Sequence, residues 1–499
     1  MTSHSPPYSP KTQPWAHQLE ALERLRGRRY YALLLAMRTG KTKVTLDDFG
    51  RLWASGHVDD LLVVAPAGVY RTWVKAISEH LGEPTGSQIQ VKLWSAHEGA
   101  SQAARRRWQG FMTPDERPRC LLVNVEALST VKRARELVLT YCGQRRVYAV
   151  VDESTTIKSP RSKRARFLAD QVSPLCEARR ILTGLVAPRD PGDVFQQFQF
   201  LRPGLLGFHS YHEFQSRYAI VARGFGRGKA PGVPQEFVKV VGWRDQEELS
   251  ARMAPHAFRV RLGDCYDLPP KIYETRDVEL TQEQERIYRE LREHACVELE
   301  EAVHVTATQA CVLALRLHQV VCGHVGDEQG IRRTIPTNRV RAVLDVLEEW
   351  DGDKAIVWCA YDQDIREVSQ ALGEVHGPLS VARFWGGNRP EREGEEARFL
   401  QDPGCRFMVA TPQAGGRGRT WSVADLVIYH SNTQDLEARE QSEERAQGVA
   451  KARSVLYVDL VGRFRDGSQT IDSAYLHSLR QKISMAALLM GDGWREWVV

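Results

Sequence analysis

The stretch Tyr30-Tyr-Ala-Leu-Leu-Leu-Ala-Met-Arg-Thr-Gly-Lys-Thr-Lys-Val44 decides the fold that we expect for this chain. It starts with an apolar run of strand length, turns sharply at Gly40, and continues into a helix that opens with Lys41-Thr42. Strand, loop and helix in this order are typical of a phosphate-binding loop, in which N–H groups at the helix N-terminus hold anionic oxygens. In such a loop Lys41 neutralises β- and γ-phosphate charge, and Thr42 ligates Mg²⁺.

The match to the full loop pattern is partial, because Leu35 stands where that pattern has its first glycine. A Gly-Lys-Thr triplet is also frequent by chance, so the loop needs support from the rest of the chain. Part of that support is a series of short apolar runs that alternate with helical segments, at residues 61–65, 120–125, 147–151 and 180–182. Such runs predict a parallel sheet covered on both faces, with its chemistry at the carboxyl ends of the strands.

Two acidic residues, Asp152 and Glu153, directly follow the apolar run 147–151. Adjacent acids are common on surfaces, but solvation alone does not place them immediately after a short buried strand. Hydrolysis at a phosphate loop needs a carboxylate for Mg²⁺ and a second group that orients and deprotonates water. Asp152 suits the metal and Glu153 the water.

A predicted amphipathic helix at residues 14–25 carries Gln18 near its start. A side-chain amide offers one acceptor and one donor, which is what the edge of adenine requires. The alternative for Gln18 is a helix cap.

The motifs that support a family resemblance run through the whole chain. They are Ala16-His-Gln18, Met37-Arg-Thr-Gly-Lys-Thr42, Val64-Ala-Pro66, Asn124-Val-Glu126, Asp152-Glu-Ser-Thr155, Leu182-Thr-Gly184, Leu315-Arg-Leu-His-Gln319, Thr411-Pro-Gln-Ala-Gly-Gly-Arg-Gly418 and the segment 441–453. With these motifs the chain resembles the Swi/Snf-type ATPases of helicase superfamily 2, particularly the compact versions from phages and bacteria. That group often lacks the early glycine of the phosphate loop.

The resemblance implies an α/β fold with two tandem RecA-like lobes, each a parallel sheet flanked by helices, and an ATP cleft between them. It implies ATP and Mg²⁺ as cofactors. The implied residues are Lys41, Asp152, Glu153 and Arg445 for catalysis; Gln18, Thr39, Gly40, Lys41, Thr42, Gly416 and Gln441 for ATP; Thr42 and Asp152 for the metal; and Ala67, Arg71, Glu126 and Thr411 for nucleic acid.

The sequence departs from the family pattern at three motifs. Ser154-Thr155 replaces Ala-His in motif II, and Leu185-Val186 stands where motif III commonly has Thr-Pro. Motif VI has Arg445 but carries Gly448 at the usual position of the arginine finger, a group worth about 10³ to 10⁵ in rate. Either Arg445 suffices, or Arg417, Arg419 or Arg453 substitutes for the missing arginine, or hydrolysis is slow. We favour Arg445 with a helper.

Composition shifts divide the chain into parts. We expect a flexible tail at 1–12, a first lobe at 13–265, a linker at 266–280, a second lobe with a helical insertion at 281–465, and a C-terminal helical tail at 466–499. Residues 223–234, rich in Gly, Arg, Lys and Pro, predict a mobile basic loop and a candidate strand-separating pin.

Composition also limits the function classes. The nine scattered cysteines include no Cys-x-x-Cys pair, which argues against a zinc module or a disulfide framework. No apolar run is long enough to span a bilayer, so we expect no membrane partner, and the scattered cysteines fit a reducing cytoplasm. The family resemblance implies a bacterial or phage-encoded protein. The net charge is only +5, but several clusters of basic residues on one chain favour a polyanion as partner.

The sequence therefore predicts an ATP-driven motor acting sequence-independently on DNA, whether duplex, single-stranded or forked, with RNA also open and protein partners unknown. The alternative is a nucleic-acid-binding remodelling or scaffold protein with a weak or vestigial ATPase, supported by Gly448 and the altered motifs II and III. A metabolic kinase that uses the same loop leaves the second lobe unexplained.

Overall fold

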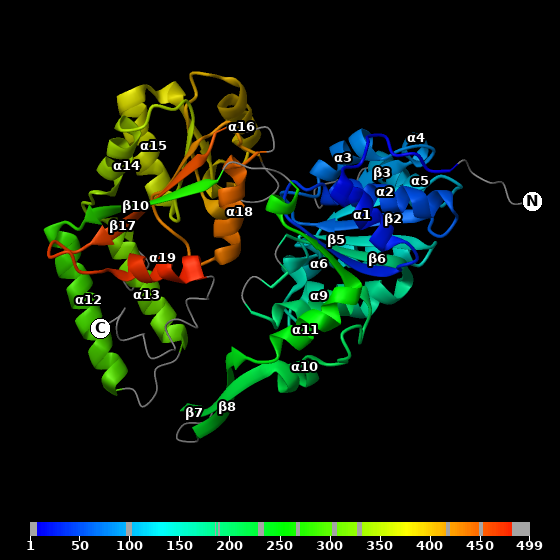
Figure 1. Cartoon of the computed structure of the whole chain (residues 1–499), viewed down its shortest axis with the longest axis horizontal. Coiled ribbons are helices and arrows are strands. Elements are labelled where there is room, and N and C mark those ends of the chain that lie inside the picture. The colour runs from blue at the N-terminus through cyan, green and yellow to red at the C-terminus, as the bar shows by residue number, and fades with distance from the viewer. Residues whose placement is uncertain are drawn as a thin grey trace, which may run out of the picture. The chain divides into compact units, whose positions relative to one another are not determined.

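The structure is a computed structural model of the 499-residue chain. It describes residues 7–95, 102–184, 186–187, 190–227, 234–265, 270–301, 307–326, 332–415, 420–448 and 453–481. The chain divides into two compact units. Unit 1 comprises Met1–Phe225 and Val233–Tyr266, and unit 2 comprises Gly226–Gly232 and Asp267–Val499. Each unit is built on a β-sheet flanked by helices (Figure 1).

The sheet of unit 1 has seven strands, and each strand is parallel to its neighbours. Their order is β3 (Gln90–Leu93), β4 (Arg119–Asn124), β2 (Asp60–Ala65), β5 (Val147–Asp152), β6 (Cys176–Leu182), β1 (Tyr30–Leu35) and β9 (Ala257–Val260). The α-helices are α1 (Ala16–Leu25), α2 (Lys41–Ala54), α3 (Thr72–His80), α4 (Thr85–Gln88), α5 (Gln102–Met112), α6 (Ala127–Thr130), α7 (Lys132–Cys142), α8 (Lys163–Arg166), α9 (Asp193–Leu201), α10 (Tyr211–Tyr218) and α11 (Gln246–Met253).

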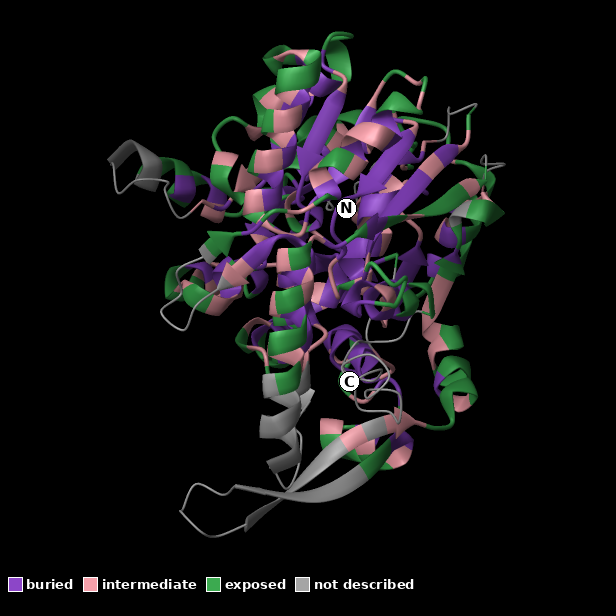
Figure 2. Ribbon diagram, turned by 90° about the vertical axis from the view of Figure 1, so that its left-hand side faces the viewer, coloured by how far each residue is buried: buried purple, intermediate pink, exposed green. Residues whose placement is uncertain are grey.

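Hydrophobic cores lie on both faces of this sheet. Leu62 and Val64 of β2 belong to one core, whereas Leu61 and Val63 of the same strand belong to the other. Side chains alternate between the faces of a strand, so a sheet covered on both sides needs strands that are apolar throughout. The buried strands of both units are purple in Figure 2.

Unit 2 contains a six-stranded parallel sheet. The order is β10 (Lys271–Glu279), β17 (Val455–Arg463), β16 (Leu426–Tyr429), β13 (Ala355–Trp358), β15 (Phe407–Ala410) and β14 (Val381–Phe384), and a small antiparallel pair is formed by β11 (His324–Gly326) and β12 (Arg332–Thr334). The helices are α12 (Gln282–Glu301), α13 (Ala307–Val321), α14 (Arg339–Glu348), α15 (Asp362–His376), α16 (Arg392–Gln401), α17 (Pro412–Gly415), α18 (Leu436–Ala446) and α19 (Ile471–Gln481). The two sheets confirm the predicted α/β architecture of two RecA-like lobes.

The linker expected at 266–280 is wrong for most of its length. Residues 271–279 form β10, which pairs with β17 over the full strand, from Lys271 opposite Val455 to Glu279 opposite Arg463. This strand lies at the edge of the sheet, and Val278 is its one buried residue. Because its side chains are mostly exposed, β10 lacks the continuous apolar run that reveals the inner strands.

The tail expected to be flexible at 1–12 is also wrong where the structure describes it, from residue 7 onward. The Tyr8 hydroxyl donates to Asp47 Oδ1 of α2 at 2.6 Å and accepts from the Gly82 N–H at 3.0 Å. Lys43 Nζ donates to the Thr12 carbonyl at 2.8 Å. Gly50 of α2 allows the N-terminal segment to pack closely, since a Cβ at this position would clash with the Tyr8 ring. Residues 1–6 lie outside the described residues.

The mobile loop expected at 223–234 is wrong at both of its ends. β7 (Ala219–Arg227) and β8 (Pro234–Trp243) form a two-stranded sheet, and residues 228–233 between them lie outside the described residues. The C-terminal helix expected within 466–499 is α19, whose Asp472 accepts from the Gly462 N–H of β17 at 2.9 Å. Residues 482–499 are not described.

Candidate functional site

The phosphate-binding loop predicted from the sequence joins β1 to α2 in unit 1. Gly40 ends the loop with a φ of 84°, in the left-handed region that favours glycine. A side chain there is excluded for a second reason, since a Cβ would clash with the amide of Gln18. Gly40 is therefore required both for the turn and for the close approach of α1.

Gln18 holds the loop to the start of α1. Its Oε1 accepts from the Trp15 N–H at 3.0 Å, and its Nε2 donates to the Thr39 carbonyl at 3.1 Å. His17 Nε2 lies 2.7 Å from the same carbonyl oxygen. Gln18 thus forms the helix cap that the sequence left open as an alternative. One N–H of its buried amide donates to the Thr39 carbonyl of the loop.

The polar groups of the loop contact the loop's own backbone. Lys41 Nζ donates to the Leu35 carbonyl at 3.0 Å and lies 3.4 Å from the Ala36 oxygen. Thr39 Oγ1 also donates to Ala36 O, at 2.7 Å. Arg38 adopts a φ of 64°, a left-handed conformation that costs about 1 kcal/mol in a residue with a side chain. The sequence did not predict this left-handed conformation of Arg38.

The predicted acid pair lies at the carboxyl end of β5. Asp152 is buried, and its two carboxylate oxygens accept from Trp73 Nε1 and from the Glu153 N–H, each at 2.9 Å. Burial raises the pKa of Asp152 above its ordinary value, while the Lys41 ammonium and these two donors act to lower it. Glu153 has a φ of 47°, and such strained residues are common in active sites. The two acids are held in a defined geometry.

The altered motifs II and III are joined by a chain of hydrogen bonds. Ser154 Oγ donates to Gln197 Oε1 of α9 at 2.6 Å, and Gln197 Nε2 donates to the Val186 carbonyl at 2.7 Å. Ser154 stands where the family pattern has alanine, and its hydroxyl makes a hydrogen bond that alanine lacks. Through Gln197 it connects the end of β5 to the segment that follows β6. Leu185 lies outside the described residues.

The predicted nucleic-acid residues of unit 1 lie where β2 and β4 end. Ala67 and Arg71 are exposed. Glu126 Oε2 accepts from the Ala67 N–H at 3.2 Å and from Asn124 Nδ2 at 3.3 Å. Glu126 is thus engaged with the turn after β2, which fits a role in shaping that turn better than direct contact with phosphate.

The predicted residues of unit 2 lie after β15 and on α18. Thr411 follows β15, and its hydroxyl accepts from the Ala414 N–H at 3.3 Å. Gln441 Nε2 donates to Glu437 one turn earlier, at 3.2 Å. Arg445 is buried, and its Nε donates to the Gln441 carbonyl at 3.0 Å. Gly416, Arg417 and Arg419 lie outside the described residues.

A second arginine of α18, Arg439, was missed by the sequence reasoning. Its guanidinium contacts Asp459 at 2.5 Å and Glu443 at 2.8 Å, and it lies 3.4 Å from the centre of the Tyr429 ring. Glu443 in turn accepts from Lys271 Nζ at 2.8 Å. This network fixes the helix that carries Arg445 to strands β16, β17 and β10.

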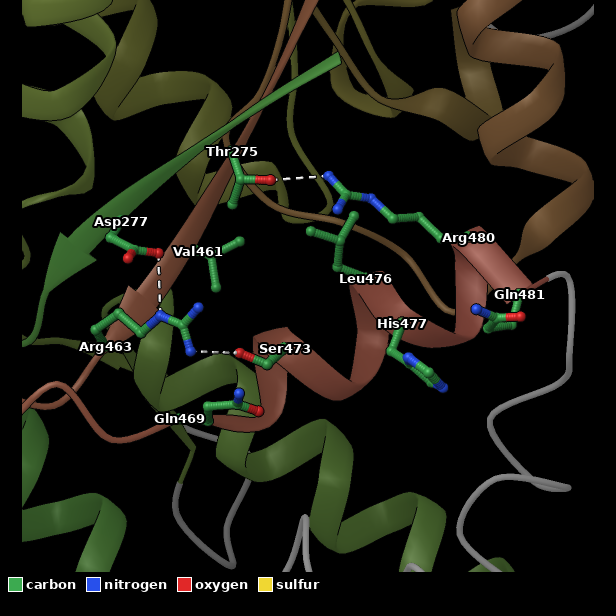
Figure 3. Close-up of a pocket in the computed structure, with 10 residues that line it drawn as sticks. All are labelled: Thr275, Asp277, Val461, Arg463, Gln469, Ser473, Leu476, His477, Arg480 and Gln481. Carbon is green, nitrogen blue, oxygen red and sulfur yellow. Dashed lines mark hydrogen bonds and ion pairs between the residues drawn. The ribbon is translucent and has the colours of Figure 1, made fainter.

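A cavity of about 560 Å³ in unit 2 lies beside β10, β17 and α19 (Figure 3). None of its lining residues belongs to the predicted site. Arg463 donates to Asp277 at 3.0 Å and to Ser473 at 3.1 Å, and Arg480 donates to Thr275 at 2.8 Å. Since both arginines have partners within the unit, we assign no ligand to this cavity.

The donor set in unit 1 suits Mg²⁺ rather than a metal held by protein alone. Mg²⁺ usually takes one or two carboxylates and substrate phosphates and keeps several waters. Thr42 and Asp152 offer one hydroxyl and one carboxylate. Within the described part of the chain, no group of three or more His, Cys, Asp or Glu residues is arranged to hold a metal ion.

Comparison with known families decides the classification. The model of the SNF2-related domain matches residues 27–325, more than half of the chain. The chain belongs to the SNF2-related domain family. This confirms the predicted Swi/Snf type within helicase superfamily 2, whereas the phage or bacterial origin stays a prediction. In the described part of this SNF2-related protein, no helix has the length and apolar character needed to cross a membrane.

Several curated proteins are similar to this SNF2-related chain in sequence. The uncharacterized ATP-dependent helicase YqhH of Bacillus subtilis is 20% identical over 516 residues, covering 98% of this chain and 81% of its own length. Protein CHROMATIN REMODELING 4 of Arabidopsis thaliana is 23% identical over 68% of this chain, and the DNA annealing helicase and endonuclease ZRANB3 of Mus musculus is 22% identical over 79%. The chain spans only 15% of the plant protein and 34% of the mouse protein.

Two solved structures are similar to this SNF2-related chain. The Sulfolobus solfataricus SWI2/SNF2 ATPase core in complex with dsDNA matches with a TM-score of 0.41 and 21% identity, over 98% of this chain and 95% of its own. The Sulfolobus solfataricus SWI2/SNF2 ATPase core domain matches with a TM-score of 0.39 and 19% identity, over 95% of this chain and 96% of its own.

Proposed function

We propose that this protein is an ATP-hydrolysing motor that acts on DNA without sequence preference. The observation that carries the proposal is the arrangement of unit 1. A phosphate loop with Lys41 follows β1, and the acid pair Asp152-Glu153 ends β5 of the same parallel sheet. The carboxyl ends of parallel strands meet at one edge of a sheet, so these groups face a common region.

Each residue of unit 1 has a distinct task in this proposal. Lys41 exchanges its bonds with the Leu35 and Ala36 carbonyls for bonds to phosphate oxygens. Thr42 and Asp152 hold Mg²⁺, which when bound neutralises charge that develops on the phosphates. Glu153 orients the attacking water and accepts its proton. The low exposure of the acid pair excludes bulk water, which strengthens these electrostatic interactions.

Unit 2 supplies the group that completes the ATPase. A guanidinium that stabilises charge on the transferred phosphoryl group is the usual contribution of a second lobe in phosphoryl transfer. Arg445 is our candidate, because the network around Arg439 fixes α18 to the sheet. Alternation between nucleotide-bound and free states would then move the lobes by hinge closure.

The proposed DNA contacts are to the phosphate backbone. Ala67 and Arg71 are exposed after β2, and Thr411 follows β15. Backbone N–H groups, hydroxyls and arginines at strand ends read phosphates rather than bases, so binding should be independent of sequence and should weaken with salt. The relatives named as helicases support action on nucleic acid, and ZRANB3 is named a DNA annealing helicase.

The alternative is a DNA-binding scaffold or remodelling protein with a weak ATPase. Gly448 in place of the second arginine favours it. The defined geometry of Asp152 and Glu153 speaks against it, because a site without a function has no reason to retain a strained residue such as Glu153.

The experiment that tests the proposal is ATP turnover with single-stranded, duplex and forked DNA and with RNA. We expect turnover to rise several-fold with at least one DNA form, and the DNA concentration for half-maximal stimulation to rise with salt. Displacement assays on forked and blunt duplexes then separate strand separation from duplex translocation. A measurable rate that no nucleic acid alters contradicts the motor, and DNA binding with no turnover supports the scaffold.

A further inference from the structure

One hydrogen bond in unit 1 joins two motifs that the sequence treats separately. Trp73 lies in the first turn of α3, two residues after the exposed Arg71, and its indole is buried. Nε1 donates to Asp152 Oδ2 at 2.9 Å, across 79 residues of sequence. The other carboxylate oxygen accepts from the Glu153 backbone at 2.9 Å. The rotation of this carboxylate is therefore set by the position of α3.

The segment before Trp73 is tightly folded. The N–H groups of Val69 and Tyr70 donate to the Pro66 carbonyl at 2.8 and 3.0 Å, and Thr72 Oγ1 donates to Val69 O at 2.7 Å. Residues 66–73 thus form a compact element with Ala67 and Arg71 exposed on it and the indole of Trp73 buried. A shift of the exposed residues would be transmitted to the buried ring.

We propose that Trp73 is a positioning residue that orients the metal-binding carboxylate of Asp152 and couples it to the nucleic-acid-contacting segment 66–71. The inference rests on the proposed function, since it requires Asp152 to hold Mg²⁺ and residues 67 and 71 to contact DNA. It adds a residue that acts on the site through Asp152, without touching ATP itself.

The chemistry of the indole N–H and of the carboxylate explains why this hydrogen bond can fix the orientation of Asp152. An indole has one donor and no acceptor, so Trp73 can satisfy its buried N–H only through an acceptor such as Asp152. A hydrogen bond to an ionised carboxylate is about twice as strong as a neutral one. Partners that orient a metal ligand in this way typically contribute roughly 10- to 100-fold to metal affinity or activity.

A role in packing alone is the competing explanation, because Trp73 belongs to the hydrophobic core on one face of the sheet. Unit 1 contains a matched control. Trp94 is also buried, it packs against Trp108 with ring centroids 6.3 Å apart, and among the described residues its Nε1 has no hydrogen-bond partner. Trp→Phe at either position removes similar volume, but only at Trp73 does it remove a bond to Asp152.

The test compares Trp73→Phe, Trp94→Phe and wild type in the full chain. ATP turnover is measured against Mg²⁺ concentration, with and without saturating duplex DNA, together with ATP binding in the absence of Mg²⁺. For Trp73→Phe we expect the Mg²⁺ concentration at half-maximal rate to rise about 10-fold. We expect the stimulation by DNA to fall, and metal-free ATP binding to stay near that of wild type.

The half-saturating Mg²⁺ concentration does not depend on how much of a sample is active, so partial unfolding of a variant leaves the test valid. Equal Mg²⁺ dependence and equal DNA stimulation in the two variants would overturn the proposal. A rise in the Mg²⁺ requirement with normal DNA stimulation would overturn the coupling to segment 66–71. Absence of turnover in wild type would instead contradict the proposed function, so the two failures are distinguishable.

Discussion

Arg445→Ala is expected to lower the ATP turnover about 10³-fold, at the lower end of what an arginine finger contributes. With Gly448 at the second arginine position, no other residue of motif VI supplies this charge within α18. The loss should appear in the maximal rate and leave the affinity for ATP nearly unchanged, because the guanidinium stabilises charge that develops in the transition state.

Arg453→Ala is the matched comparison for Arg445→Ala. Arg453 is exposed, and it was one of the helpers considered from the sequence. If Arg445 acts alone, Arg453→Ala should retain turnover within about twofold, a difference of about 0.4 kcal/mol. A large loss of turnover in Arg453→Ala with little loss in Arg445→Ala would show that Arg453, and not Arg445, is the arginine finger. Thermal unfolding of both variants checks that the folded state is preserved.

Lys41→Ala is expected to lower turnover by roughly 10²- to 10³-fold, the loss seen when a charged donor to a transition state is removed. The free energy of unfolding of unit 1 should also fall, by about 1 to 3 kcal/mol, because the substitution removes a buried donor to the Leu35 carbonyl and the ammonium that favours the ionised form of Asp152. Turnover and thermal unfolding measure the two effects. A substitution at Lys43 would be a poor control, because Lys43 is buried in an ion pair with Asp47 at 2.8 Å.

Lys75→Ala serves as the control for Lys41→Ala. Its side chain on α3 is 79% exposed and pairs with Glu79 on the same helix. Such surface pairs contribute little to stability, so this variant should behave as wild type. A chain whose turnover survives Lys41→Ala would not use the phosphate loop for hydrolysis.

The inner strands could be predicted because burial on both faces demands apolar residues at every position. β2 and β5 contain the apolar runs 61–65 and 147–151, and they lie where those runs predict. Edge strands carry no such constraint. β10 exposes most of its residues, so its pattern of residues does not differ from that of a loop.

The candidate site was predictable to the extent that its chemistry is local in sequence. The spacing of Gly40, Lys41 and Thr42 and the position of Asp152 after a strand are visible without a structure. Contacts across the fold were not. In the sequence Trp73 carries no signal of a role at the site, and only the fold brings its indole to Asp152.

The roles of the two arginines of α18 also could not be predicted from the sequence. Arg439 and Arg445 lie six residues apart on α18 and cannot be told apart by residue type. Arg439 makes contacts with Asp459 and Glu443 that fix the helix, whereas Arg445 Nε donates to the Gln441 carbonyl one turn earlier. Only the fold shows that Arg439 has a structural role.

We propose that Lys41 and Arg445 both act in the hydrolysis of the same ATP molecule. The most direct measurement is cross-linking with an ATP analogue that carries a photoreactive group on its γ-phosphate, followed by mass spectrometry of the labelled peptides. We predict labels both in the phosphate loop, residues 37–42, and in α18, and we predict that excess ATP and Lys41→Ala suppress both. Labels confined to unit 1 under all conditions, with and without DNA, would contradict the account.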